Sequence, residues 1–371
     1  MALVLLTPMP ATGAPKPRKE LYWFDWWELE KKVWPITMGE GVTVAVIDDE
    51  VNRGLPDLQG AVLPNIGMDA VRVKPDRENG GHGTAMTALI VGQGRGTGMV
   101  GVAPRAKVLP LVAYFDDGWA KAIRYAADHG VKVVNMSRGS AAFQPCEGEV
   151  QDSISYAVKR DVVVVVSAGN EGRRGGWRSF PANCAGVLAV GGLDGHVRPW
   201  SESTPGEYVM VAAPSVEAGS IDGGGQFEWR GHAGTSQAAA LTSGVVALVR
   251  SKYPKMPARE VVQRLLATSR DVGKPGWDDV TGYGLVRPYR ALVDKVPTNA
   301  PNPIYDNGAH QKASVKPPGV RPSAEKRTSV PTSTEEQVSR DKWVLPAMGV
   351  VGIAVILVLA GYGLFRKSKK A

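Results

Sequence analysis

The sequence predicts an α/β domain of three layers, in which a mostly parallel sheet carries helices on both faces. Runs rich in valine and isoleucine alternate with helical segments between residues 41 and 268, as expected when parallel strands are joined by crossover helices. The apolar content of 43% and the charged content of 22% are those of a globular protein with a real core. A chain of 371 residues could hold one large domain or two ordinary ones.

The first residues have the pattern of a secretory signal. Residues 2–6 are apolar, and small residues follow up to a cleavage region near Ala14. The apolar run is short and has no basic leader, so we interpret residues 1–19 as a truncated signal segment. A start codon assigned too far downstream would explain both defects.

An aromatic segment over residues 21–34 precedes the first predicted strand. We expect it to form a helical N-terminal arm that its rings clamp onto the domain surface. A patch that binds carbohydrate or peptide is the alternative.

The predicted elements then follow in alternation. Strands are expected over residues 41–48, 106–113, 131–136, 162–166 and 187–190, and helices over residues 118–129, 149–159 and 261–268. Two further helices are expected to open at His82 and at Ser236, and a glycine-containing loop over residues 277–285 closes the domain.

Three polar residues lie at the ends of these elements. Asp48 ends a buried strand, and functional groups in open α/β sheets gather beyond the carboxyl ends of such strands. His82 stands between glycines at the start of an apolar helix, where a substrate could approach closely. Alone, Asp48 could be a solvated turn acid and His82 a structural histidine.

Ser236 opens a helix of small and apolar residues that is expected to be buried on all sides. The free N–H groups and the positive dipole end of such a helix favour a developing negative charge. Either Thr235 or Ser236 caps this helix, or Ser236 is a nucleophile. The order Asp, His, Ser along the chain, each at an element end, favours the nucleophile.

The chain after residue 295 has a different composition. Residues 296–341 are rich in Pro, Ser, Thr and Lys and are predicted to be a disordered linker. Residues 344–365 are uncharged, and at ~1.5 Å per residue they span a bilayer core of ~30 Å, so a transmembrane helix is placed at residues 342–366. The basic tail at residues 367–371 faces the cytoplasm by the positive-inside rule, and the globular domain at residues 20–295 faces outward.

Charge and cysteines add two limits. Much of the net charge of +8 lies in the linker and the tail, without interleaved aromatics, so nucleic acid binding is not expected. Cys146 and Cys184 lack the spacing of a zinc site, and they could form one disulfide if the domain lies outside the cytoplasm.

Taken together, the motifs resemble those of the subtilisin-like serine proteases. VAVID around Asp48, GHGT around His82, VVNMS before Gly139, SAGN ending at Asn170 and GTS at Ser236 match that family, over residues 34–293. Within the family the chain looks most like the mycosins, the membrane-anchored proteases of actinobacterial type VII secretion systems. This similarity rests on four features: the segment WPITMGEGVTVAVID, the turn at residues 55–58, the proline-rich linker and the single C-terminal membrane helix.

The resemblance implies a serine endopeptidase that cleaves protein or peptide substrates through an acyl-enzyme. Ser236 would attack, His82 would carry the proton, Asp48 would orient His82, and Asn170 with the Ser236 N–H would hold the oxyanion. No cofactor is implied and no metal takes part in cleavage; structural calcium occurs in the wider family, but no ligand cluster argues for it here. The residues expected to line the substrate cleft are Ser137, Arg138, Gly139, Ala168 and Gly169.

Some residues depart from the family pattern. Asp49 and Glu50 follow Asp48 where the family usually has Ser or Thr and then Gly, Ala240 replaces a usual proline, and Arg138 replaces an apolar residue. Arg138 is expected to favour acidic substrate residues near the cut. These departures leave open a weakly active or inactive subtilase that acts as a structural component of a membrane secretion complex.

Overall fold

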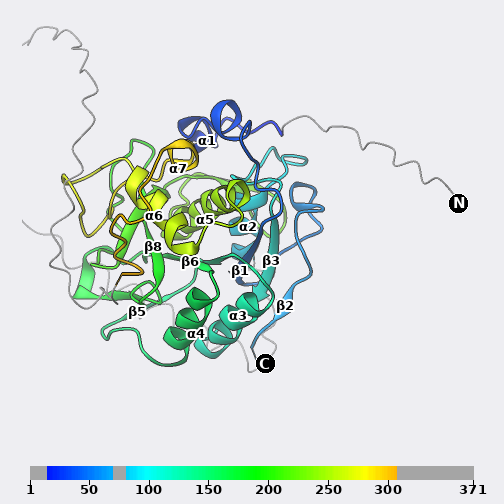
Figure 1. The fold of residues 1–371 in the computed structure, drawn as a ribbon. Helices are drawn as coiled ribbons and strands as arrows, with labels where there is room; N and C mark the ends of the chain where they lie inside the picture. The colour runs from blue at the N-terminus through cyan, green and yellow to red at the C-terminus, as the bar shows by residue number, and fades with distance from the viewer. Residues whose placement is uncertain (1–14, 70–80, 307–371) are drawn as a thin grey trace, which may run out of the picture. The chain divides into compact units, whose positions relative to one another are not determined.

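The central element of the fold is a seven-stranded sheet in which every pair of neighbours is parallel. The computed structural model describes residues 15–69 and 81–306 (Figure 1). Across the sheet, the strands are β2 (Ile66–Gly67), β3 (Lys107–Val112), β1 (Thr43–Asp48), β4 (Val133–Met136), β6 (Val163–Ser167), β8 (Val187–Leu193) and β9 (Val209–Pro214). The predicted parallel sheet is confirmed.

The direction of strand addition reverses beside β1. The chain adds β2 and β3 on one side of β1 and then β4, β6, β8 and β9 on the other. Asp48 at the end of β1 pairs with Val112 of β3, and Ile47 pairs with Met136 of β4. A reversal of this kind opens a crevice at the carboxyl ends of the strands, where α/β proteins bind ligands.

Both faces of the sheet are buried. Neighbouring residues of a strand point to opposite faces, so each strand contributes side chains to two apolar clusters. In β1, Val44 and Val46 belong to one apolar cluster, and Ala45 and Ile47 belong to the other. The first cluster packs under α2 (His82–Val91), α5 (Thr235–Lys252), α6 (Ala258–Thr268) and α7 (Pro288–Val293). The second packs under α3 (Asp116–Asp128) and α4 (Gly148–Lys159), so helices cover both faces (Figure 1).

Two small antiparallel sheets lie outside this frame: β5 (Ser140–Ala142) with β7 (Arg178–Phe180), and β10 (Ser220–Ile221) with β11 (Phe227–Glu228). The sequence did not predict them, nor β2, β9 and α7, because segments of two to six residues carry little periodicity. Cys146 and Cys184 form a disulfide, as considered from the sequence.

The N-terminal arm packs on the domain as expected. It contains α1 (Tyr22–Trp26) and one π-helical turn, η1 (Leu29–Val33), and Trp23, Phe24 and Trp27 are buried. The Nε1 of Trp23 donates to the carbonyl of Ala218 at 2.6 Å. The rings therefore serve packing rather than an open binding patch. Residues 15–19 of the predicted signal segment also lie on the domain, where the Arg18 N–H donates to the carbonyl of Gly98.

Contacts with the domain continue beyond residue 295, after which the linker was predicted to begin. Asn302 and Ile304 are buried, and Asp306 forms an ion pair with Arg259 of α6. Within residues 15–69 and 81–306, no helix is both long and apolar enough to cross a membrane. The predicted membrane helix at residues 342–366 and most of the linker lie outside the described residues.

Candidate active site

Asp48 is the buried anchor of the site. The valine-rich run of β1 forms a strand covered on both faces, and it ends with the Asp48 carboxylate fully buried at the crevice beside β4. Its Oδ1 accepts hydrogen bonds from the Asp49 N–H at 2.8 Å and from Arg138 Nε at 2.8 Å. Burial alone would raise the pKa of Asp48, but His82 and Arg138 hold it below its ordinary value, so the carboxyl is ionised.

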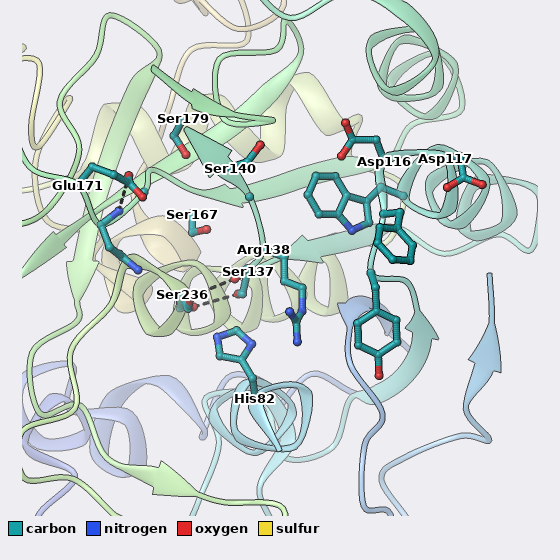
Figure 2. A pocket seen from close by; sticks show the side chains of 16 residues that line it. His82, Asp116, Asp117, Ser137, Arg138, Ser140, Ser167, Glu171, Ser179 and Ser236 are labelled. Carbon is teal, nitrogen blue, oxygen red and sulfur yellow. Dashed lines mark hydrogen bonds between the residues drawn. The ribbon is translucent and has the colours of Figure 1, made fainter. Parts of the chain in front are cut away.

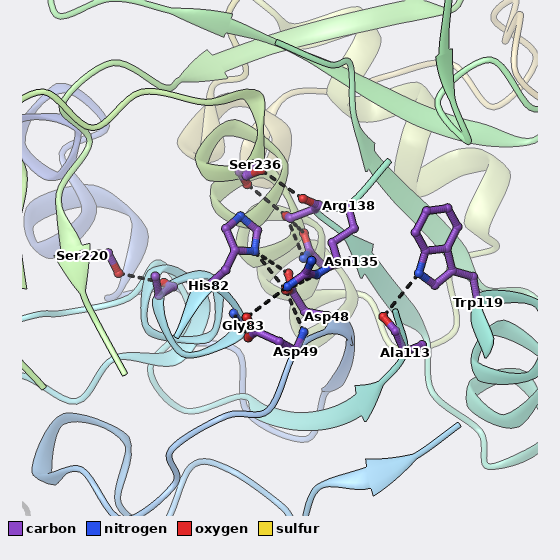
Figure 3. Close-up of polar contacts among 12 residues, drawn as sticks. Asp48, Asp49, His82, Gly83, Ala113, Trp119, Asn135, Arg138, Ser220 and Ser236 are labelled. Atoms are coloured by element: carbon purple, nitrogen blue, oxygen red, sulfur yellow. Dashed lines mark hydrogen bonds and ion pairs between the residues drawn. The ribbon is translucent and has the colours of Figure 1, made fainter. Parts of the chain in front are cut away.

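His82 is the first residue of α2 and faces this carboxylate. Its Nδ1 lies 2.9 Å from Oδ1 and 2.8 Å from Oδ2 of Asp48 (Figure 3). Because an ionised carboxylate only accepts hydrogen bonds, Nδ1 carries the proton and Nε2 is the free base. Burial disfavours the charged imidazole, but Asp48 outweighs it, so the pKa of His82 is raised above 6.5.

Ser236 is the second residue of α5, and Gly234 stands at the N-cap of this helix. The Ser236 hydroxyl donates to the Ser137 carbonyl at 3.0 Å, and the Ser137 hydroxyl donates back to the Ser236 carbonyl at 3.1 Å. Figure 3 places His82 between Ser236 and Asp48. Among the described residues, Nε2 of His82 has no hydrogen-bond partner, so the structure brings Ser236 and His82 to one site without bonding them.

Asn170 follows β6 and is fixed by the turn before Ser236. Its Oδ1 accepts from the Thr235 N–H at 2.9 Å and lies 2.9 Å from the Thr235 hydroxyl. A backbone N–H needs an acceptor, so the amide oxygen faces Thr235 and the Nδ2 group points away. Nδ2 has no partner in the described part of the chain and remains available as a donor.

A cleft of about 920 Å³ joins these side chains (Figure 2). Ser137, Arg138, Gly139 and Gly169 line it, as expected from the sequence. Ala168 does not, because its side chain is fully buried in the core and the cleft is lined by Ser167 and Gly169 on either side of it. The other lining residues include Tyr114, Phe115, Asp116, Asp117, Trp119, Ser140, Glu171 and Ser179.

Arg138 lines the cleft but has its charge engaged at the base of the site. Its guanidinium bonds to Asp48 and, through Nη2, to Asp49 at 3.0 Å. A guanidinium held by two carboxylates attracts a third only weakly. The structure therefore does not support the expectation that Arg138 favours acidic substrate residues near the cut.

A buried polar chain below the cleft was not foreseen. Nδ2 of Asn135 in β4 donates to the Ser137 hydroxyl at 3.0 Å, and Oδ1 accepts from the Ser243 hydroxyl of α5 at 3.1 Å. These bonds tie the end of β4 to the helix that carries Ser236. An asparagine within the apolar run VVNM is the signal that could have indicated this, since a buried amide needs partners.

No metal site accompanies the cleft in the part of the chain that the structure describes. There, no group of three or more His, Cys, Asp or Glu side chains lies close enough to hold an ion. What the arrangement offers is a serine hydroxyl, an imidazole base with a buried carboxylate behind it, and a free amide donor. These are the groups needed for nucleophilic attack on a carbonyl.

Comparison with known proteins yields a family match. Residues 39–284 match the model of the subtilase family, the peptidase family S8. Fervidolysin of Fervidobacterium pennivorans is 32% identical over 312 residues, which cover 73% of this chain and 44% of fervidolysin. The chain thus spans less than half the length of that relative.

The mycosins are also among the similar proteins. Mycosin-1 of Mycobacterium tuberculosis is 32% identical over 352 residues, covering 78% of this chain and 76% of the mycosin. The crystal structure of MycP1 from the ESX-1 type VII secretion system superposes with a TM-score of 0.64 at 28% identity. The superposition covers 79% of this chain and 90% of MycP1.

Proposed function

Because the chain belongs to the subtilase family of serine proteases, we propose that it is an endopeptidase whose catalytic residues are Asp48, His82 and Ser236. The observation that carries this proposal is the Asp48 carboxylate on Nδ1 of His82, with Ser236 facing the same imidazole across the cleft. Protein or peptide chains are the substrates, and no cofactor enters the mechanism.

In the proposed mechanism, the Ser236 side chain first turns from the Ser137 carbonyl toward Nε2 of His82. His82 removes the hydroxyl proton as Oγ attacks the scissile carbonyl, and then gives that proton to the leaving amine. Asp48 holds the tautomer with Nε2 free and stabilises the imidazolium. Water releases the acyl group from Ser236 by the same steps in reverse order.

The tetrahedral intermediate needs donors for its oxyanion. We assign this role to Nδ2 of Asn170 and the backbone N–H of Ser236 at the start of α5. The bonds from Thr235 to Oδ1 of Asn170 support this assignment, because they fix the amide before substrate arrives. The substrate would lie extended between residues 137–139 and Gly169, adding a strand to these edges.

We further propose that the protease is anchored in the cell membrane by residues 342–366, with the peptidase domain outside, and that it works with components of a type VII secretion system. The uncharged run at residues 344–365, the Cys146–Cys184 disulfide and the similarity to MycP1 support this.

A second candidate is a weakly active or inactive subtilase that serves as a structural part of the secretion complex. The bond from the Ser236 hydroxyl to Ser137 favours it, because a hydroxyl held there is not activated by His82. The two roles can coexist in one protein.

A fluorophosphonate probe tests the catalytic proposal. The full chain in detergent should be labelled on Ser236, and Ser236→Ala should abolish labelling. Ser140→Ala, which changes another serine of the cleft, is the matched control and should label normally. A wild-type protein that stays unlabelled, or labelling that survives Ser236→Ala, would contradict the proposal.

Complementation of a deletion strain separates the two roles. Secretion restored by Ser236→Ala, but not by a chain lacking residues 344–365, would assign the structural role. Secretion lost in Ser236→Ala would show that cleavage is required. Recovery of the full chain in the soluble fraction would rule out the membrane anchor.

A further inference from the structure

Arg138 and Asp49 stand next to the catalytic pair, yet neither belongs to the triad. Arg138 directly follows the Ser137 whose carbonyl receives the Ser236 hydroxyl, and Asp49 directly follows Asp48. The Arg138 guanidinium bridges both carboxylates, with Nε 2.8 Å from Asp48 Oδ1 and Nη2 3.0 Å from Asp49 Oδ2 (Figure 3). One rigid fork thus fixes two side chains of β1 and the loop after it.

Asp49 also holds the helix that carries His82. Its Oδ1 accepts the Gly83 N–H at 2.6 Å, which satisfies one of the free donors at the start of α2. Gly81 stands at the N-cap of α2 and has no side chain to do this. A Cβ on Gly83 would lie 2.5 Å from the Asp49 carbonyl oxygen and 2.8 Å from Oδ1, so glycine is required for this approach.

The two residues balance each other in charge. Asp49 is only 6% exposed, and an unpaired carboxylate charge that is buried so far costs free energy of folding. With His82 neutral, Asp48, Asp49 and Arg138 sum to one negative charge. Asp48 alone would give the same sum. Burial and Asp48 raise the pKa of Asp49, while the Gly83 N–H and the Arg138 guanidinium oppose this and stabilise the extra carboxylate.

We propose that Arg138 and Asp49 act as one positioning unit for the catalytic pair: Asp49 fixes the start of α2 and hence His82, while Arg138 fixes Asp48 and cancels the charge of Asp49. The inference rests on the proposed function. It explains why the two departures from the family pattern at residues 49 and 138 occur together.

The charges around His82 agree with this arrangement. Burial lowers the pKa of His82, Asp48 raises it, Arg138 lowers it and Asp49 raises it. The contributions of Arg138 and Asp49 thus have opposite sign. Other titratable groups share a cavity with His82: Tyr114, Asp116, Asp117 and Glu171 line the cleft, and Asp222, Glu228 and His232 line the adjoining pocket.

The test titrates His82 by NMR in the Ser236→Ala background, where no turnover is needed. Asp49→Asn keeps an oxygen for the Gly83 N–H but removes the charge, so the pKa of His82 should fall. Arg138→Met keeps the aliphatic stem without the charge, so the pKa of His82 should rise. In the double variant the two shifts should cancel.

Kinetics with the intact serine give a second readout. The kcat/KM of the double variant should exceed the product of the two single effects by about 2- to 100-fold, as for residues in one charge network. Arg138→Lys keeps the charge but loses the rigid planar fork that fixes both carboxylates, so the His82 titration should stay near that of the wild type while kcat falls.

Titrations that do not move in folded single variants would overturn the inference and leave a structural role only. A double variant whose His82 pKa stays displaced from the wild-type value would overturn it as well. If Arg138 instead binds substrate directly, Arg138→Met should change KM for acidic peptides and leave the pKa of His82 unchanged. That result would also overturn the inference. Absence of probe labelling in the wild type would instead remove the proposed function, and the His82 titration would still decide the coupling.

Discussion

At the scale of single residues, the surroundings of Asp48 set the working range of His82. The buried carboxylate accepts three donors, and His82 shares it with Arg138. Only the neutral imidazole can take the Ser236 proton, so activity requires a pH above the pKa of His82.

The pH profile follows from this. The pKa of His82 is raised above 6.5, so kcat/KM should rise with pH through a midpoint above 6.5. The profile of kcat/KM on a peptide substrate measures this midpoint. His196→Gln, at an exposed histidine away from the cleft, should leave the profile unchanged. A midpoint at or below 6.5 would show that Asp48 does not stabilise the imidazolium.

Asn170 provides a second residue-scale prediction. Asn170→Leu keeps the volume but removes the Nδ2 donor, so kcat should fall by about 10²–10³-fold, the range measured for the oxyanion-hole asparagine of subtilisin, a relative. KM should change little, since the donor acts mainly on the transition state. Ser140→Ala serves as the control for a neutral change in the cleft. A loss smaller than about tenfold would take the oxyanion role away from Asn170.

Residue identity could be predicted here, but side-chain partners could not. Asp48, His82, Asn170 and Ser236 stand in sequence motifs; the structure brings the last three to one cleft and places Asp48 buried behind His82. The bond between Arg138 and Asp49 joins residues 89 positions apart, and no local pattern reports it. Ala168 was misplaced because neighbouring residues point to opposite sides, and only the structure decides which side faces the cleft.

At the scale of elements, α5 connects Ser236 to the core. It runs unbroken from Thr235 to Lys252 through Ala240, where the family usually has proline, and its first sixteen residues are buried except for Gln237. Packing nevertheless requires one residue of low helix propensity inside this helix. This residue is Gly244, because a Cβ there would lie 2.7 Å from Cβ of Val102.

Gly244→Ala should therefore destabilise the domain despite a better helix propensity. Replacing glycine gains about 1 kcal/mol within a helix, while overpacking a core costs about 1–3 kcal/mol. We expect the free energy of unfolding to fall by up to about 2 kcal/mol in chemical denaturation. A more stable Gly244→Ala protein would mean that the segment around Val102 moves away from the new methyl group at little cost.

At the scale of the whole molecule, the domain boundary at residue 295 was predicted from composition, and contacts with the domain continue beyond it. Pro and Asn residues after Val296 indicated a linker, but composition reports average solvation and misses single anchoring contacts. Here Asn302 donates through Nδ2 to the Arg259 carbonyl at 2.8 Å, and Arg259 Nε donates to Asp306 at 2.9 Å. Ile304 completes the hydrophobic core formed with α5, α6 and α7.

This C-terminal segment should therefore contribute to domain stability. Ile304 is only 3% exposed, and truncating a buried isoleucine to alanine costs about 2–5 kcal/mol, so Ile304→Ala should lower the free energy of unfolding by that amount. Val293→Ala, at a residue 38% exposed on α7, is the matched control and should change it by less than about 1 kcal/mol. Urea unfolding of the detergent-solubilised chain, followed by tryptophan fluorescence, compares the two. Equal effects would mean that the chain after residue 295 is linker after all; a larger loss at Ile304 would mean that the peptidase domain ends beyond it.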